Sequence, residues 1–186
     1  MDEVALVRHG ETDWSRALRH TGRTDIPLNE NGRRQARKLA ARLTGRSFSR
    51  VLTSPLGRAA ETCRLAGFAD QAAVTPDLVE WDYGEYEGVT TAEIHASRPH
   101  WLLWRDGCPQ GERAIEVGAR VDRVLDELRP QEGSALLFAH GHLLRVLAAR
   151  WLRLAPESGA LFALSAGSLS LLTYEHAIPV IGVWNS

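Results

Sequence analysis

Short apolar runs alternate with amphipathic segments along most of the chain. Residues 4–7 and 135–138 are uninterrupted apolar runs, and residues 51–53, with the sequence Val-Leu-Thr, form a shorter segment of strand-forming residues. Continuous apolar runs of this length are typical of strands that are buried on both faces, as in parallel sheets. These segments therefore predict three central strands of a largely parallel sheet.

Helical periodicity is clearest in residues 114–128. One apolar stripe of this segment contains Val117, Val121, Val124, Leu125 and Leu128. Three more helices are predicted: from Asn29 to a stop at Gly45, directly after the strand at 51–53, and over residues 143–152. Helices that alternate with parallel strands cover both faces of the sheet.

The remaining segments predict an edge hairpin and an insertion. Residues 169–174 and 178–184 are rich in β-forming residues and joined by a short turn, so we expect neighbouring strands at a sheet edge. Residues 80–111 are irregular, with one short helix at 91–97, and we interpret about 81–111 as a small cap inserted in a single domain, residues 1–186. The predicted fold class is α/β: a three-layer α/β/α sandwich with a mostly parallel central sheet, an antiparallel edge strand and this cap.

Composition excludes several classes of function. The chain has 186 residues and a net charge of -1 with both signs interspersed, so it has no overall attraction to nucleic acid or to a membrane surface. No apolar run approaches the roughly 18 residues of a membrane span. The acidic start at Asp2 and Glu3 is unlike a secretory signal, so we expect a cytoplasmic protein. Cys63 and Cys108 are isolated in sequence, which argues against a disulfide framework or a zinc site.

Each of the three predicted central strands leads into a group that can bind an anion. Arg8 and His9 directly follow the first apolar run, and His140 closely follows the last. Arg58 falls in the first turn of the helix after the short strand, where free backbone N–H groups also favour anions. Because the carboxyl ends of parallel strands meet at one edge of a sheet, we expect these four side chains to converge.

These residue types suit the hydrolysis of a phosphate monoester, with neutral His9 as the nucleophile. Arg8, Arg58 and a protonated His140 can hold the phosphoryl oxygens and stabilise their charge. The leaving group also needs a proton donor. Glu80 is a candidate because it stands between an apolar pair and aromatic residues, and desolvation favours the protonated carboxyl group. Four other carboxylates remain open as alternatives: Glu11, Asp82, Glu85 and Glu87.

The spacing of His140 and His142 also matches a pair of metal ligands. A metal site needs further ligands, and a pocket lined by arginines would repel a divalent cation, so we place His142 at the rim of the pocket instead. The other histidines have no partner at a meaningful spacing and are interpreted as surface or packing residues: His20, His95, His100 and His176.

Four blocks of the sequence together resemble the histidine phosphatase superfamily, which is also called phosphoglycerate mutase-like. They are LVRHGET at 6–12, TSPLGRA at 53–59, the segment from Glu80 to Gly88, and AHG at 139–141. The blocks occur in the family's order and span nearly the whole chain. The first two are each fairly specific, so the four together identify the family.

The resemblance implies a role for each of these residues. His9 would be phosphorylated during turnover, and Glu80 would donate the proton. Arg8, Arg58 and His140 would bind the phosphoryl group, and neither a metal nor another cofactor is expected. The remaining residues expected to contact the substrate are Ser15, Thr21, Gly22, Tyr83, Gly141 and His142.

Departures from the mutase pattern favour transfer of the phosphoryl group to water. Trp81 stands where mutases carry an arginine, and Ser15 and His142 each stand where they carry an asparagine. Residues 104–108 and 138–145 instead resemble the branch of acid phosphatases and sugar bisphosphatases.

We therefore predict a metal-independent phosphomonoesterase for small phosphorylated metabolites, most active at mildly acidic pH. Phosphoglycerate mutase is the alternative, and a catalytically inactive phosphate-binding module is the second alternative. No nucleic acid or membrane partner is expected, and the sequence leaves open whether the protein forms a homodimer.

Overall fold

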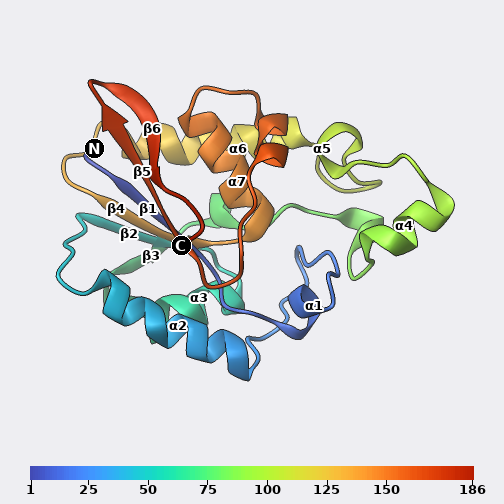
Figure 1. Cartoon of the computed structure of the whole chain (residues 1–186), viewed down its shortest axis with the longest axis horizontal. Coiled ribbons are helices and arrows are strands. Elements are labelled where there is room, and N and C mark those ends of the chain that lie inside the picture. Colours follow the sequence, from blue (N-terminus) through green and yellow to red (C-terminus); the bar gives the residue numbers. More distant parts are fainter.

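The protein is built around one six-stranded sheet (Figure 1). A computed structural model describes all 186 residues. The strands are β1 (Val4–Arg8), β2 (Arg50–Thr53), β3 (Ala72–Val74), β4 (Ala135–Ala139), β5 (Leu169–Glu175) and β6 (Ile178–Val183). Their order is β3-β2-β4-β1-β5-β6, with the first four strands parallel and β5 antiparallel to both of its neighbours. The mostly parallel sheet is confirmed, and its antiparallel strand lies one position in from the edge formed by β6.

Helices cover both faces of this sheet, as the three-layer prediction requires. The α-helices are α1 (Asp13–Arg16), α2 (Glu30–Leu43), α3 (Gly57–Leu65), α4 (Thr91–Ser97), α5 (Leu103–Asp106), α6 (Ala114–Leu128) and α7 (Gly141–Trp151). Short 3-10 helices are η1 (Ala69–Gln71), η2 (Pro76–Leu78), η3 (Gly84–Tyr86) and η4 (Pro156–Leu161). In Figure 1, α2 and α3 lie on one side of the strands, and α6 and α7 lie on the other.

Alternate residues of β1 point to opposite layers, which explains its uninterrupted apolar sequence. Val4 and Leu6 belong to the larger core, which includes α6 and α7, whereas Ala5 and Val7 belong to the smaller core beneath α2 and α3. All four side chains are buried. Because side chains alternate along a strand, Arg8 continues the row of Val4 and Leu6 and emerges on the α7 side of the sheet.

The strongest periodic signals predict the element boundaries best. Helices α4 and α6 have the predicted bounds. Helix α7 begins at Gly141 rather than at residue 143, because the Glu80 carboxylate accepts the N–H groups of His142 and Leu143 and so satisfies its first turn. Strand β3 and helix α1 were not predicted, since three or four residues are too few to show a period.

The register of the parallel strands aligns their carboxyl ends. Arg8 at the end of β1 lies opposite Ala139 at the end of β4. Thr53 at the end of β2 lies opposite Phe138, one residue earlier on β4. The residues that follow these three strands therefore leave the sheet at the same edge.

The loop after β1 packs directly against α2 and α3. A Cβ atom on Gly10 would lie 2.3 Å from the carbonyl oxygen of Gly32, so this close approach requires glycine. The Gly10 N–H also donates to Thr62 Oγ1 of α3 at 3.1 Å. Both helices thereby hold the backbone next to His9 in place.

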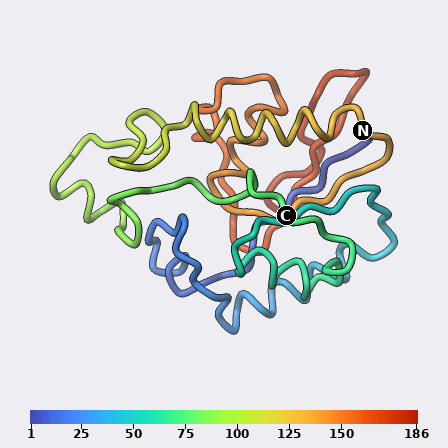
Figure 2. The backbone as a smooth tube through the Cα atoms, turned by 180° about the vertical axis from the view of Figure 1, so that it is seen from behind, coloured from blue at the N-terminus to red at the C-terminus, as the bar shows by residue number.

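Residues 84–106 carry η3, α4 and α5 and extend beyond the carboxyl ends of the strands (Figures 1 and 2). Two backbone hydrogen bonds join this segment to the loop after α1: Gly88 N–H donates to the His20 carbonyl at 2.8 Å, and His20 N–H donates to the Val89 carbonyl at 3.0 Å. The segment therefore has a defined position next to that loop. None of the helices is long and apolar enough to cross a membrane.

Candidate active site

Four predicted phosphate-binding side chains gather at the carboxyl edge of the sheet. Arg8 and His9 line a cavity, whereas Arg58 and His140 have no exposed surface. The rings of His9 and His140 meet edge to face, with their centroids 5.2 Å apart. The positive charges of Arg8 and Arg58 act on both rings. The structure thus brings these four residues together.

His9 presents a defined nitrogen to the cavity. Its Nδ1 lies 2.7 Å from the Gly10 carbonyl oxygen, which can only accept, so Nδ1 carries the ring proton and Nε2 carries the lone pair. Burial first, and then the charges of Arg58 and Arg8, lower the pKa of His9 well below its ordinary value of 6.5. His9 is therefore neutral, with Nε2 available as a nucleophile at neutral and mildly acidic pH.

Arg58 fixes the loop after α1. Its terminal nitrogens donate to the carbonyl oxygens of Thr21, Gly22 and Thr24 at 2.8 to 3.1 Å. The Glu87 carboxylate accepts the N–H groups of Gly22 and Thr24 from the same loop. Gly22 thus contacts Arg58 through its backbone and does not line the cavity. The Nε atom of Arg58 has no hydrogen-bond partner in the protein.

His140 is neutral rather than cationic, which differs from the expectation from the sequence. Burial first, and then the charges of Arg58, His9 and Arg8, lower the pKa of His140 well below 6.5. Ser54 Oγ lies 2.8 Å from His140 Nε2 and already accepts the Leu56 N–H. The Ser54 hydroxyl still has its own proton to donate, and when it donates to Nε2 the ring proton lies on Nδ1. A neutral His140 then still offers one N–H donor.

Three buried side-chain nitrogens have no hydrogen-bond partner in the protein, and all belong to this group: Arg8 Nε, Arg58 Nε and His140 Nδ1. An unmet buried donor costs about 1–3 kcal/mol, and proteins rarely leave one unpaired without a functional reason. Three such donors beside a neutral imidazole suit a group with several negatively charged acceptor oxygens. A phosphoryl group meets this description.

Glu80 lies against the first turn of α7, at the same edge of the sheet. Its carboxylate accepts the backbone N–H groups of Trp81, His142 and Leu143 at 2.9 to 3.0 Å. The side chain of Arg120 on α6 donates to the Glu80 carbonyl and positions the backbone of this segment. Among the acidic side chains that sequence reasoning left open, only Glu80 lines the cavity; the others are Glu11, Asp82, Glu85 and Glu87.

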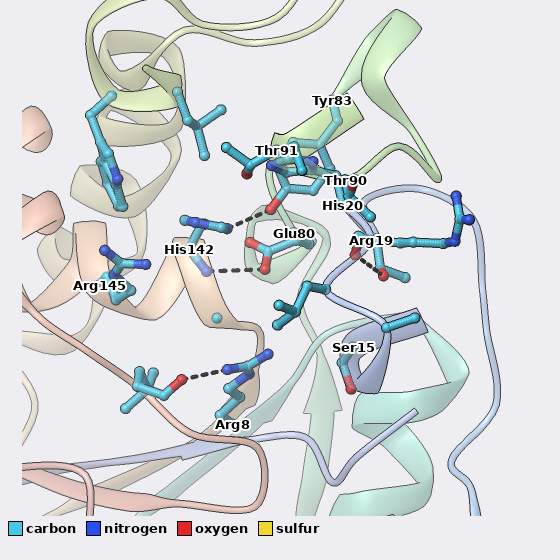
Figure 3. A pocket seen from close by; sticks show the side chains of 18 of the residues that line it. Arg8, Ser15, Arg19, His20, Glu80, Tyr83, Thr90, Thr91, His142 and Arg145 are labelled. Atoms are coloured by element: carbon cyan, nitrogen blue, oxygen red, sulfur yellow. Dashed lines mark hydrogen bonds between the residues drawn. The ribbon is translucent and has the colours of Figure 1, made fainter. Parts of the chain in front are cut away.

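A cavity of about 610 Å³ is lined by His9 and by residues of the segment 84–106. Figure 3 shows part of its wall. Of the expected substrate-binding residues, those that line it are Ser15, Thr21, Tyr83, Gly141 and His142. Tyr83 Oη and His142 Nδ1 are 2.6 Å apart. Burial lowers the pKa of His142 and raises the pKa of Tyr83, so the Tyr83 hydroxyl keeps its proton and donates to the neutral ring.

Sequence reasoning missed several residues of the cavity wall. His20, interpreted as a surface or packing residue, packs against Tyr83 with the two rings tilted by 58° and their centroids 4.8 Å apart, and it lines the cavity. Trp101, Trp104 and Arg145 line it as well. A helical signal could have placed Arg145, because it lies one turn after Gly141 and His142, whereas nothing in the local sequence of His20 indicates its position.

The two cysteines, and the histidine pair His140 and His142, serve packing and hydrogen bonding. Cys63 and Cys108 are buried free thiols, and burial raises the pKa of each to about 12. His140 bonds to Ser54 and His142 to Tyr83, so the two rings have separate partners. No cluster of three or more histidine, cysteine, aspartate or glutamate side chains is arranged to hold a metal ion.

A three-layer α/β protein that gathers a neutral histidine and two arginines at the carboxyl edge of its sheet is of the class that handles phosphoryl groups. The family model of the histidine phosphatase superfamily (branch 1) matches residues 4–186. The chain therefore belongs to this superfamily, as its sequence blocks predicted.

Individual proteins are also similar to this chain. An acid phosphatase of Mycobacterium tuberculosis is 40% identical over 185 residues, which cover 97% of this chain and 90% of that protein. A probable phosphoglycerate mutase of Yersinia enterocolitica is 32% identical over 197 residues, with 99% and 90% covered. A solved structure of an open reading frame product of Mycobacterium tuberculosis superposes with a TM-score of 0.93 at 38% identity, covering 99% of this chain and 97% of that one.

The buried histidines make folding stability depend on pH. The pKa values of His9, His20, His140 and His142 are all lowered, chiefly by burial. Below about pH 6.5 the unfolded chain takes up protons that the folded protein resists, so stability falls as the pH falls. Between pH 7.5 and 5.5 we expect a loss of about 1 kcal/mol for each histidine that stays neutral.

Urea unfolding followed by tryptophan fluorescence between pH 5.5 and 8 measures this loss. Replacing His140 with asparagine removes one of these groups and should flatten the profile, whereas His100→Gln at an exposed position should leave it unchanged. A free energy of unfolding that is constant over this range would contradict the neutral histidines.

Proposed function

We propose that this protein hydrolyses small phosphate monoesters without a metal ion, through a phosphohistidine at His9. The three unpaired buried nitrogens of Arg8, Arg58 and His140 carry this proposal, because they offer the phosphoryl oxygens donors from the same group of side chains that contains the nucleophile. The proposal agrees with membership of the histidine phosphatase superfamily. It agrees also with the similarity to an acid phosphatase.

The reaction would proceed in two steps. In the first, His9 Nε2 attacks phosphorus, the ester P–O bond breaks, and Glu80 in its protonated form gives its proton to the leaving oxygen. In the second, water attacks the phosphohistidine while the Glu80 carboxylate accepts a proton from it. The N–P bond then breaks, phosphate leaves, and both side chains return to their starting forms.

The segment at about 81–111 would act as a cap that selects the leaving group. It contributes Tyr83, Thr90, Trp101 and Trp104 to the cavity wall. Tyr83 and Thr90 lie across the cavity from Arg8 (Figure 3). Specificity would thus depend on this segment, and the phosphoryl site on the strand ends.

Phosphoglycerate mutase activity is the second candidate, favoured by the similarity to a probable mutase. Position 81 weighs against it, because Trp81 is fully buried and donates its Nε1–H to the Glu112 carbonyl. No cation therefore follows Glu80 where the mutase pattern places an arginine.

Phosphate release from p-nitrophenyl phosphate tests the proposal. We expect turnover that is unchanged by EDTA, and a phosphoprotein that loses its label in acid but keeps it in alkali, as phosphohistidine does. Conversion of 3-phosphoglycerate to 2-phosphoglycerate faster than phosphate release would instead identify a mutase. Phosphate binding without turnover or labelling would identify an inactive binding module.

A further inference from the structure

Arg120 on α6 uses every N–H group of its guanidinium inside the protein. An arginine side chain carries five such donors. Nε and Nη2 donate to the two carboxylate oxygens of Glu112 at 2.7 and 2.8 Å. The other three N–H groups donate to backbone carbonyl oxygens of one segment, those of Asp77, Val79 and Glu80, at 2.8, 3.0 and 3.4 Å. Arg120 therefore holds the backbone that leads into Glu80.

Glu112, the partner of Arg120, joins the two ends of the segment at about 81–111. Its N–H donates to the Asp82 carbonyl at 2.8 Å, and its Oε2 accepts the Asp82 N–H at 2.9 Å. Its own carbonyl accepts the Trp81 Nε1–H at 2.9 Å. The ion pair thus fixes the chain on both sides of Glu80, with Arg120 acting before it and Glu112 after it.

The Arg120–Glu112 pair is largely buried, with side chains that are 11% and 16% exposed. Removing two charges from water is costly, and an apolar pair of similar volume often gives a protein at least equal stability. Stability alone is therefore a weak explanation for the pair. A neighbour provides the contrast: Arg123 is 60% exposed and pairs with the Asp77 carboxylate at 2.6 and 2.9 Å, without a hydrogen bond to Glu80.

Glu80 is held at both ends, between α6 and α7. Arg120 binds its carbonyl from α6, while its carboxylate accepts the N–H groups of His142 and Leu143 in the first turn of α7 (Figure 3). Arg120 forms its ion pair with Glu112 and not with Glu80. The guanidinium therefore places Glu80 through the backbone, without a salt bridge to the carboxylate.

We propose that Arg120, paired with Glu112, is a positioning residue that sets the place of the Glu80 carboxyl group for proton transfer. This inference rests on the proposed phosphatase function, in which Glu80 gives its proton to the leaving oxygen. Proton transfer requires heavy atoms within hydrogen-bond reach, and a displacement of about 1 Å can cost on the order of 100-fold in rate. Arg120 does not line the cavity, so it acts on the leaving group through Glu80.

Two esters with different leaving groups test the proposal. Glycerol 3-phosphate has a leaving group that needs a proton, whereas p-nitrophenolate leaves readily without one. In Arg120→Met we expect kcat/KM to fall by about 10- to 100-fold for glycerol 3-phosphate, and by about 3-fold or less for p-nitrophenyl phosphate. A purely structural role would lower both values alike. The effect of the Arg120 charge on His140, which belongs to the phosphoryl site, would also lower both.

Further variants assign the effect to Glu80. Adding Arg120→Met to Glu80→Gln should not lower the rate for glycerol 3-phosphate further, because a proton donor that is already absent cannot be displaced. Arg120→Lys keeps the charge with fewer donors and should lose less than Arg120→Met, and it replaces Arg120→Met in every comparison if the latter does not fold. Arg123→Met removes the exposed neighbour and should leave the ratio of the two esters unchanged.

Failure of this inference is distinct from failure of the proposed function. An unchanged ratio in Arg120→Met, or additive losses in the double variant, would refute the positioning role while the phosphatase stands. If the wild-type protein hydrolyses no ester, amide hydrogen exchange decides the role of Arg120. The His142 and Leu143 amides, which donate to Glu80, should exchange about 10-fold faster or more in Arg120→Met than in the wild-type protein or in Arg123→Met. Equal exchange rates would overturn the inference.

Discussion

Replacing His9 with alanine is expected to lower kcat/KM for p-nitrophenyl phosphate by about 10,000-fold or more, the scale seen when an enzyme loses its nucleophile. The structure gives the reason. Gly10 holds Nδ1 in its protonated state, so Nε2 is the one basic ring atom that can attack phosphorus. Burial first, and then the charges of Arg58 and Arg8, keep the ring neutral by lowering its pKa, and no other side chain replaces both properties.

Three measurements make the His9→Ala result specific. Acid-labile labelling of the protein should disappear together with turnover, whereas thermal unfolding should still show a cooperative transition. The matched control is His100→Ala, at an exposed position between α4 and α5, which should retain full activity. Wild-type rates in His9→Ala would exclude His9 as the nucleophile.

Replacing Glu80 with glutamine is expected to affect alkyl phosphates far more than aryl phosphates. An alkoxide is a poor leaving group that needs a proton, whereas p-nitrophenolate leaves readily without one. We expect kcat to fall by about 100- to 1,000-fold for glycerol 3-phosphate, and by about 10-fold or less for p-nitrophenyl phosphate. The difference between the two substrates is the diagnostic quantity, and equal losses would argue against a role as proton donor.

The same substitution has a structural consequence that must be separated from the chemical one. The Glu80 carboxylate accepts three backbone N–H groups. In Glu80→Gln one of its two oxygens becomes an NH2 group, which cannot accept a hydrogen bond. We expect the free energy of unfolding to fall by about 1–3 kcal/mol in Glu80→Gln. Glu85→Gln, which changes an exposed carboxylate of the same segment, serves as the control and should alter neither leaving-group dependence nor stability.

The order of the main elements could be predicted because each carries a local periodic signal. Strand β4 and the first four residues of β1 are apolar because they are buried on both faces, and α6 has a continuous apolar stripe because one of its faces packs on the core. Strand β3 pairs only with β2 at the sheet edge, and its alanines do not show the β-branched pattern that predicts a strand. Its place depends on pairing with a partner, which no local pattern reports.

Local sequence patterns also predicted the residues of the proposed phosphoryl site. Arg8, His9 and His140 stand where the apolar runs end, and the rule that parallel strands end at one edge is enough to bring them together. Arg58 follows from the same rule, with the first turn of α3 as its position. These inferences need only local patterns and one general property of parallel sheets.

Three features of the site depend on tertiary contacts: the carboxylate that faces the cavity, the nitrogen of His9 that is basic, and the neutral state of His140. Each depends on groups far apart in the chain: Glu80 meets the first turn of α7, and His140 meets Ser54 after β2. The place of Arg145 is decided in the same way, by carbonyl groups of η4 and by the ring of Trp104. Electrostatics and hydrogen bonding act through space, so the state of a side chain is set by its neighbours in the fold rather than by its neighbours in the sequence.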